Sequence, residues 1–299
     1  MVTVIPIVER WEELETKNIF IVCSKQTSET ACSIAQIAAC ADLNVSLKCE
    51  NQASCKKATG EIKKIMEAKV TSGELKAEQI DAAMGRIKTT TDLGDAKNAD
   101  VVIESLFEDE DLKRKALIEL DRICAPGAIL ATNTSAITVT SLARTTSHPE
   151  RVIGMHFVHF SPIMRVVEIV RGMLTSDDTF AKIEALAKSL GQEIAIAEDA
   201  PGLLSTRLWL VYINQAANDV YRKLATSEGL KTLSRTIAPN ALSPLESADF
   251  LGLDSCIALL QNLYQAYGDL KYFPSPLLTQ MVDAGQLGRR SGKGFFNYT

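Results

Sequence analysis

The first part of this chain lacks glycine: the first one is Gly60. A glycine-rich turn between a first strand and a first helix lets the backbone take positive φ and approach a phosphate group closely. Residues 18–22 form an apolar run that predicts such a strand, and residues 29–41 predict the helix that follows. Every residue of the connecting stretch, C-S-K-Q-T-S, carries a Cβ atom, which makes positive φ costly. The sequence therefore lacks a standard phosphate-binding turn at this place.

Three further absences narrow the class of protein. The net charge of −5 argues against general nucleic-acid binding, and no apolar run reaches the roughly 18 residues of a membrane span. The seven cysteines include no C-x-x-C pair and are odd in number, which predicts free thiols in a reducing compartment. The chain has only three histidines, and their spacing indicates no metal site.

Strand-like and helical segments alternate through the first two thirds of the chain. The predicted strands are residues 18–22, 45–49, 100–104, 128–132, 151–155, 166–170 and 193–197. This alternation predicts an α/β fold with a doubly wound, mostly parallel sheet. After the D-A-P-G stretch only helical patterns remain, at 203–224, 244–251, 255–267 and 276–284. We therefore expect a dinucleotide-binding type of domain over residues 1–199 and an all-α domain over 200–299.

Seven motifs follow one another along the chain, and each occurs once. They are A-T-N-T-S at 131–135, R-V-I-G-M-H-F at 151–157, V-V-E at 166–168, D-A-P-G at 199–202, P-L-E-S-A-D at 244–249, G-L-D at 252–254 and L-G-R-R-S-G-K-G-F-F at 287–296. In this order and spacing the chain resembles the 3-hydroxyacyl-CoA dehydrogenase family over essentially its whole length. The resemblance implies a Rossmann-like first domain and a helical second domain that takes part in substrate binding and dimerisation.

The resemblance places a catalytic pair at His156 and Glu168. In the family, such a histidine removes the hydroxyl proton of the substrate while hydride passes to NAD, and the glutamate orients the histidine. Imidazole suits general-base work at neutral pH, and a carboxylate on its second nitrogen fixes the tautomer. The alternative is a buried pair kept only as a hydrogen-bonded core feature. Ser135 matches the serine that hydrogen-bonds the substrate oxygen, and otherwise it is a turn or capping serine.

Other positions match the cofactor side of the family's cleft. Glu108 and Lys113 match positions near the nicotinamide ribose and the CoA side. Their alternative reading is a solvated helix start, where acidic residues favour the helix dipole.

Several positions depart from the family pattern. Ser24 and Gln26 lie in the glycine-free loop that should hold the pyrophosphate. Cys49 stands where an acidic residue should bind the adenosine ribose, and the adjacent Glu50 would point to the other face of a regular strand. Lys25 is the one residue of the loop that could compensate by neutralising phosphate charge.

The substrate side departs as well. Thr206 replaces the family's catalytic asparagine after the D-A-P-G turn, and a threonine hydroxyl cannot reproduce the reach of an amide. His159 replaces an asparagine near the nicotinamide. We interpret it as a half-exposed histidine at the end of a strand.

These losses gather at cofactor and substrate contacts, while the packing motifs remain. We therefore expect a non-catalytic relative that has lost NAD binding and serves as a structural or interaction subunit. The alternative is a diverged NAD-dependent L-3-hydroxyacyl-CoA dehydrogenase of fatty-acid β-oxidation. A third hypothesis is a sensor that binds an acyl-CoA or a nucleotide without turnover.

The resemblance also carries expectations about partners and location. It implies a homodimer or a place in a larger protein assembly, acyl-CoA as a ligand, and the mitochondrial matrix, with the cytoplasm as the alternative. The first 16 residues carry four glutamates and resemble neither a transit peptide nor a signal peptide. We expect no nucleic-acid partner, no membrane span and no metal.

Overall fold

The sheet that the sequence predicts is present. The computed structural model describes residues 16–24, 28–158, 166–238 and 242–298. In these residues eight strands form one sheet in the order β3-β2-β1-β4-β5-β6-β7-β8. The strands are β1 Asn18–Cys23, β2 Asn44–Lys48, β3 Ile87–Thr90, β4 Val101–Ser105, β5 Ile129–Thr132, β6 Val152–Phe157, β7 Val166–Arg171 and β8 Glu193–Glu198. Only the β6–β7 pair is antiparallel, which confirms the predicted Rossmann-like, mostly parallel sheet.

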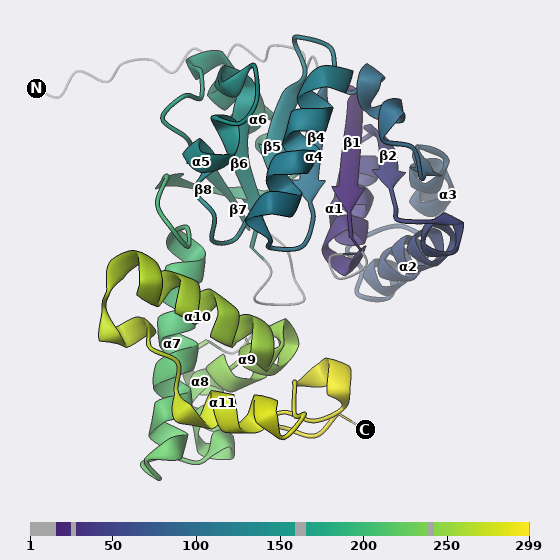
Figure 1. Cartoon of the computed structure of the whole chain (residues 1–299). Helices are drawn as coiled ribbons and strands as arrows, with labels where there is room; N and C mark the ends of the chain where they lie inside the picture. Colours follow the sequence, from purple (N-terminus) through teal and green to yellow (C-terminus); the bar gives the residue numbers. More distant parts are fainter. Residues whose placement is uncertain (1–15, 25–27, 159–165, 239–241, 299) are drawn as a thin grey trace, which may run out of the picture.

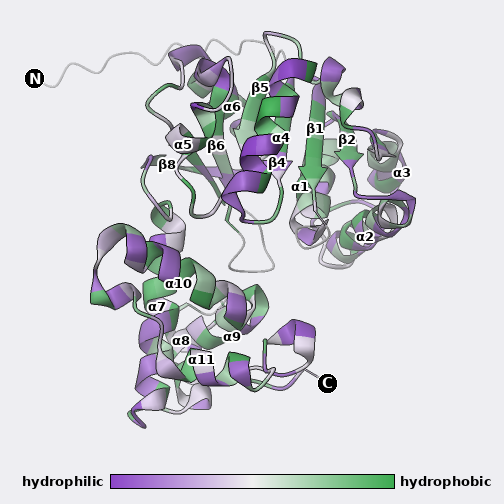
Figure 2. Ribbon diagram, in the orientation of Figure 1, coloured by the Kyte–Doolittle hydropathy of each residue, from purple (hydrophilic) through white to green (hydrophobic). Residues whose placement is uncertain are grey.

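Helices cover both faces of the sheet, and its central strands β4, β5 and β6 are buried along their whole length. One face packs against α1 Ser28–Cys40, α2 Gln52–Thr71, α3 Glu78–Gly85 and α6 Asp177–Ser189. The other packs against α4 Glu110–Ile123 and α5 Val139–Ala143. Figure 2 shows β1 as hydrophobic along its length, as expected for a strand buried on both faces.

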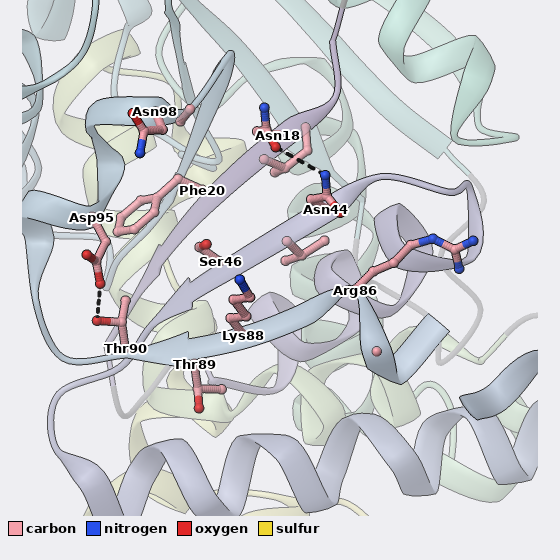
Figure 3. A pocket seen from close by; sticks show the side chains of 14 residues that line it. Asn18, Phe20, Asn44, Ser46, Arg86, Lys88, Thr89, Thr90, Asp95 and Asn98 are labelled. Atoms are coloured by element: carbon pink, nitrogen blue, oxygen red, sulfur yellow. Dashed lines mark hydrogen bonds between the residues drawn. The ribbon is translucent and has the colours of Figure 1, made fainter. Parts of the chain in front are cut away.

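The edge strand β3 is not among the predicted strands. Its four residues read I-K-T-T and are only half buried or exposed, so no apolar run marks them. Beside it, the sheet face opposite α1 and α2 is hollowed over β1, β2 and β3. This hollow has a volume of about 620 Å³ and is lined mainly by polar side chains such as Asn18, Ser46 and Lys88. The Phe20 ring also lines it (Figure 3).

A separate layer of helices lies below the sheet in Figure 1, on the side to which the arrowheads of β1 and β4 point. It consists of α7 Leu204–Tyr221, α8 Ser227–Ile237, α9 Pro244–Leu251, α10 Leu253–Tyr267 and α11 Pro276–Asp283. These helices share an apolar core of their own. The helix α8 is not among the predicted helices. Ser234 is its only buried residue. In the described residues no helix is both long and apolar enough to cross a bilayer.

The D-A-P-G segment, residues 199–202, precedes α7 and is hydrogen-bonded to the chain between β5 and α5 and to α5 itself. The Asp199 carboxylate accepts hydrogen bonds from the backbone N–H groups of Val139 and Thr140, each at 2.8 Å. The Gly202 N–H donates to the carbonyl oxygen of Ala136 at 2.8 Å. Gly202 has φ +79°, and a Cβ atom there would lie 2.1 Å from Leu263 Cδ2. Only glycine fits this position, and the segment brings the start of α7 beside the end of β5.

Candidate active site

Three of the four predicted catalytic side chains, those of Ser135, His156 and Glu168, meet where β6 ends and β7 begins. His156 and Glu168 are direct partners across the antiparallel β6–β7 pair. His156 Nδ1 lies 3.3 Å from Glu168 Oε2, and His156 Nε2 lies 3.2 Å from Ser135 Oγ. His156 and Glu168 are 4% and 1% exposed. The structure therefore arranges hydroxyl, imidazole and carboxylate in a row.

The Glu168 carboxylate also faces the first turn of α7. It accepts hydrogen bonds from the backbone N–H of Leu204 at 2.5 Å and of Ser205 at 3.3 Å, and from the Ser205 hydroxyl. Helix N-termini carry free N–H groups and favour negative charge. Burial by itself would raise the pKa of Glu168, but the hydrogen bonds from His156 and Ser205 bring that pKa below its ordinary value. Glu168 is therefore ionised at neutral pH.

An ionised Glu168 fixes the tautomer of His156. The carboxylate can only accept hydrogen bonds, so the imidazole proton is assigned to Nδ1. Nε2 is then left with a free lone pair on the side of Ser135. This arrangement can remove a proton from a hydroxyl group near Ser135 and stabilise the resulting imidazolium.

Ser205 is a site residue that the sequence analysis missed. Its Oγ donates to Glu168 and lies 3.4 Å from His156 Nδ1. The sequence instead predicts a role for the next residue, Thr206. This side chain is 1% exposed, and its Oγ1 has no hydrogen-bond partner among the described residues. A hydroxyl residue in the first turn of the helix after D-A-P-G is the signal that could have pointed to Ser205.

We expect Ser205→Ala to shift the pH dependence of stability. The Ser205 hydroxyl is one of the groups that lower the pKa of Glu168, so its loss raises that pKa. Urea denaturation over a pH series should therefore show that the stability contributed by ionised Glu168 is lost at higher pH on acidification, with kcat at neutral pH changed by less than about tenfold. Ser205→Thr keeps the hydroxyl and should leave the pH dependence of stability in place. An unchanged pH dependence of stability in Ser205→Ala would contradict this role.

The turn that carries Ser135 is held by Glu108. Its Oε1 accepts the backbone N–H of Ser135 at 3.1 Å and of Ala136 at 2.8 Å, and the Thr134 hydroxyl at 2.5 Å. The carboxylate thus satisfies donors that would otherwise be left without partners after β5. Glu108 thus positions Ser135, and its predicted place near the nicotinamide ribose stays a prediction.

Lys113 lies behind Glu108 and is fully buried. Its Nζ donates to Glu104 Oε1 at 2.9 Å and to the Leu106 carbonyl at 3.1 Å, and it lies 3.6 Å from Glu108 Oε2. Burial alone would lower the pKa of Lys113, but Glu104 and Glu108 raise it above its ordinary value. These contacts give Lys113 a structural role, and its predicted contact with cofactor or CoA stays a prediction.

Lys113→Met should lower the free energy of unfolding by about 3 to 5 kcal/mol, because it leaves Glu104 buried without its cation. Urea denaturation of both proteins measures this difference. Lys115→Met, at an exposed position of the same helix, is the matched control and should change stability by less than about 0.5 kcal/mol. Equal stabilities of the two variants would show that the buried pair contributes nothing.

A cavity of about 420 Å³ opens at the carboxyl ends of β1 and β2. Its lining includes Ser24, Ser28, Cys49, Glu50 and Asn51. The prediction that Glu50 points away from Cys49 is wrong, because β2 ends at Lys48 and both residues line this cavity.

Three of the positions singled out in the sequence, Lys25, Gln26 and His159, lie outside the described residues.

The cavity lies where a doubly wound sheet holds the adenosine half of a dinucleotide. In such folds the pyrophosphate lies at the first strand-to-helix turn and an acidic residue after the second strand binds the ribose hydroxyls. Ser24 and Ser28 flank that turn, and Glu50 offers the carboxylate. Glu29 and Glu61 also line the cavity, and Lys57 is the one lysine in its lining among the residues that the structure describes. These carboxylates suit ribose hydroxyls better than an additional phosphate.

Comparisons with known proteins agree with this geometry. The family described as "3-hydroxyacyl-CoA dehydrogenase, NAD binding domain" matches residues 31–200, and its "C-terminal domain" matches residues 202–298. The chain is 36% identical to a probable 3-hydroxybutyryl-CoA dehydrogenase of Bacillus subtilis, over 95% of this chain and 98% of that protein. It is 38% identical to one of Deinococcus radiodurans, over 89% and 95%. The crystal structure of (S)-3-hydroxybutyryl-CoA dehydrogenase from Ralstonia eutropha superposes with a TM-score of 0.84 at 35% identity, covering 95% of this chain and 99% of that one.

These relatives correct the expected function. The prediction of a non-catalytic subunit is wrong, because proteins 36% and 38% identical over nearly the whole chain are named as dehydrogenases. The match to an NAD-binding domain likewise speaks against the expected loss of NAD binding. The match begins at residue 31, after the glycine-free turn on which that expectation rested.

Proposed function

This chain belongs to the 3-hydroxyacyl-CoA dehydrogenase family, and on that premise we propose that it is an active NAD-dependent dehydrogenase of short 3-hydroxyacyl-CoA substrates such as (S)-3-hydroxybutyryl-CoA. The observation that carries the proposal is the row formed by Ser135, His156 and Glu168. A pair kept only for packing would not need a free imidazole nitrogen facing a serine hydroxyl.

Ser135, His156 and Glu168 carry out the proton transfer of the reaction. His156 Nε2 accepts the proton of the substrate hydroxyl, and Ser135 Oγ donates a hydrogen bond to the same oxygen. The buried Glu168 carboxylate stabilises the imidazolium through Nδ1. When bound, nicotinamide supplies the acceptor for the hydride that leaves the substrate carbon.

The cofactor would be held in the cavity at the carboxyl ends of β1 and β2. Ser24 and Ser28 would donate hydroxyl hydrogen bonds to the pyrophosphate, with the N-terminus of α1 behind them. Glu50 would accept hydrogen bonds from the adenosine ribose hydroxyls in place of the acidic residue that Cys49 replaces. Side-chain donors thus do the work that backbone donors do in a glycine-rich turn.

Titration with NADH, followed by energy transfer from tryptophan, tests this arrangement. We expect saturable binding in the micromolar range and at least about tenfold weaker binding of NADPH, since Glu29, Glu50 and Glu61 repel the extra phosphate. Glu50→Gln should weaken NADH binding by about tenfold. Glu67→Gln, at an exposed position of α2 outside the cavity, should not change it. The absence of binding up to millimolar NADH would contradict the proposal.

The homodimer, the larger assembly and the mitochondrial location stay predictions.

A further inference from the structure

Four buried cysteines gather beside the nucleotide cavity. Cys23, Cys32, Cys49 and Cys55 are between 1% and 5% exposed, and the first three line the cavity itself. No group of three or more metal-binding side chains in the described part of the chain has an arrangement that could hold a metal ion. The proposed dehydrogenase mechanism uses none of these thiols.

Cys23 and Cys49 are placed as a pair. β1 and β2 are parallel neighbours whose last register partners are Val22 and Lys48, so Cys23 and Cys49 are the next residue on each strand. The Cys23 thiol donates a hydrogen bond to the carbonyl oxygen of Lys48 at 3.5 Å, and Lys48 directly precedes Cys49. Neighbouring strands lie about 4.8 Å apart, which falls within the about 4.4 to 6.8 Å between Cα atoms that a disulfide requires.

We propose that Cys23 and Cys49 are a modification site, a thiol pair that a hydroperoxide oxidises to a disulfide in the wall of the nucleotide cavity.

The step balances as a two-electron oxidation. The Cys23 sulfur attacks one peroxide oxygen, the O–O bond breaks, and water leaves, with the sulfur now a sulfenic acid. The Cys49 sulfur then attacks Cys23, the S–O bond breaks, an S–S bond forms, and a second water carries away the thiol proton. Two thiols are oxidised and one hydrogen peroxide is reduced to two waters.

The surroundings give the two thiols different roles. The hydrogen bond from Cys49 lowers the pKa of Cys23, although burial acts against it, so Cys23 is the more acidic thiol of the pair and attacks the peroxide first. Hydrogen bonding with Cys23 and burial raise the pKa of Cys49, so Cys49 is the resolving thiol. Burial raises the pKa of Cys32 to about 12, which leaves it unreactive.

One consequence rests on the proposed function. A dinucleotide bound in this cavity would cover both sulfur atoms and shield them from the oxidant. We therefore expect saturating NADH to slow the formation of the disulfide.

The experiment is oxidation of the full chain with stoichiometric hydrogen peroxide, followed by alkylation of free thiols and peptide mass spectrometry. We expect one cross-linked peptide joining Cys23 to Cys49, reversed by dithiothreitol. Cys23→Ser and Cys49→Ser should each abolish it, and Cys23→Ala serves if the serine variant does not fold. Cys124→Ser, a buried thiol on the other face of the sheet, should leave it unchanged.

The outcomes separate the two proposals. A link between Cys49 and Cys55, or thiols that stay reduced, overturns the pairing even if NADH binds saturably. A Cys23–Cys49 link whose rate of formation is the same with and without saturating NADH supports the thiol site and overturns the placement of the nucleotide. Slower formation of the link in the presence of saturating NADH supports both the thiol site and the placement of the nucleotide.

Discussion

His156→Gln should lower kcat for oxidation of 3-hydroxybutyryl-CoA by about 10² to 10⁴-fold, the range that a positioned general base contributes. Glutamine keeps a hydrogen-bonding side chain next to Ser135 and Glu168 but cannot take up a proton at neutral pH. We therefore expect the affinity for NADH and the thermal unfolding midpoint to stay close to those of the unchanged protein. Steady-state kinetics with NADH binding on the same preparation measures both effects.

His148 is the matched control for this variant. Its side chain is 46% exposed and lies 3.9 Å from Asp121, on the loop before β6. His148→Gln should leave kcat within about twofold of the unchanged protein, as expected for a surface substitution. Full activity in His156→Gln would show that another group removes the proton and that the catalytic row has been assigned wrongly.

Glu168→Gln should also reduce kcat by about 10² to 10⁴-fold, for a different reason. Glutamine has one acceptor oxygen where the carboxylate has two, so it cannot accept from both His156 Nδ1 and the Leu204 N–H group, and it has no charge to stabilise the imidazolium. Serine proteases lose activity in the same way when the carboxylate behind their histidine becomes an amide. Glu193→Gln, at an exposed position on the neighbouring β8, should leave kcat unchanged.

The same variant should change how stability depends on pH. The folded-state pKa of Glu168 is lowered by its hydrogen bonds, so its ionisation stabilises the fold above the unfolded-state pKa of about 4.3 and this contribution disappears as pH falls through the folded pKa. Urea denaturation should therefore show the largest stability difference between the two proteins at neutral pH and a smaller one toward acid. A difference that grew toward acid would contradict the assigned ionisation state.

Much of the fold could be predicted because its signals are local. Apolar runs mark most of the strands, and the order of the motifs identifies the family. The pairing of His156 with Glu168 could be predicted from the resemblance to the family. Their direct register across β6 and β7 could not, because it depends on the antiparallel turn of β7 within an otherwise parallel sheet.

Tertiary placement accounts for what the sequence did not reveal. Lys113 reads as part of a solvated helix start, and only the fold shows that it is buried between Glu104 and Glu108. Glu50 reaches the cavity because β2 ends at Lys48, one residue before its predicted end. Ser205 joins the site because the first turn of α7 lies against Glu168 of β7.

The wrong functional prediction has its own cause. It took the loss of glycine from one turn as the loss of phosphate binding. That inference leaves out the side chains that replace glycine, because S-K-Q-T-S at residues 24–28 supplies hydroxyl, amide and ammonium donors. A single sequence shows which backbone donors are harder to present, and it does not show which side-chain donors take their place.

Reduction of acetoacetyl-CoA by NADH, followed by the fall in NADH absorbance, tests the central claim most directly. An active dehydrogenase should turn over at about 1 to 10³ per second, within the range of ordinary enzymes. His156→Gln, assayed beside it, should fall by at least about a hundredfold. The same slow rate in both proteins, with NADH and acetoacetyl-CoA at saturating concentrations, would contradict the account.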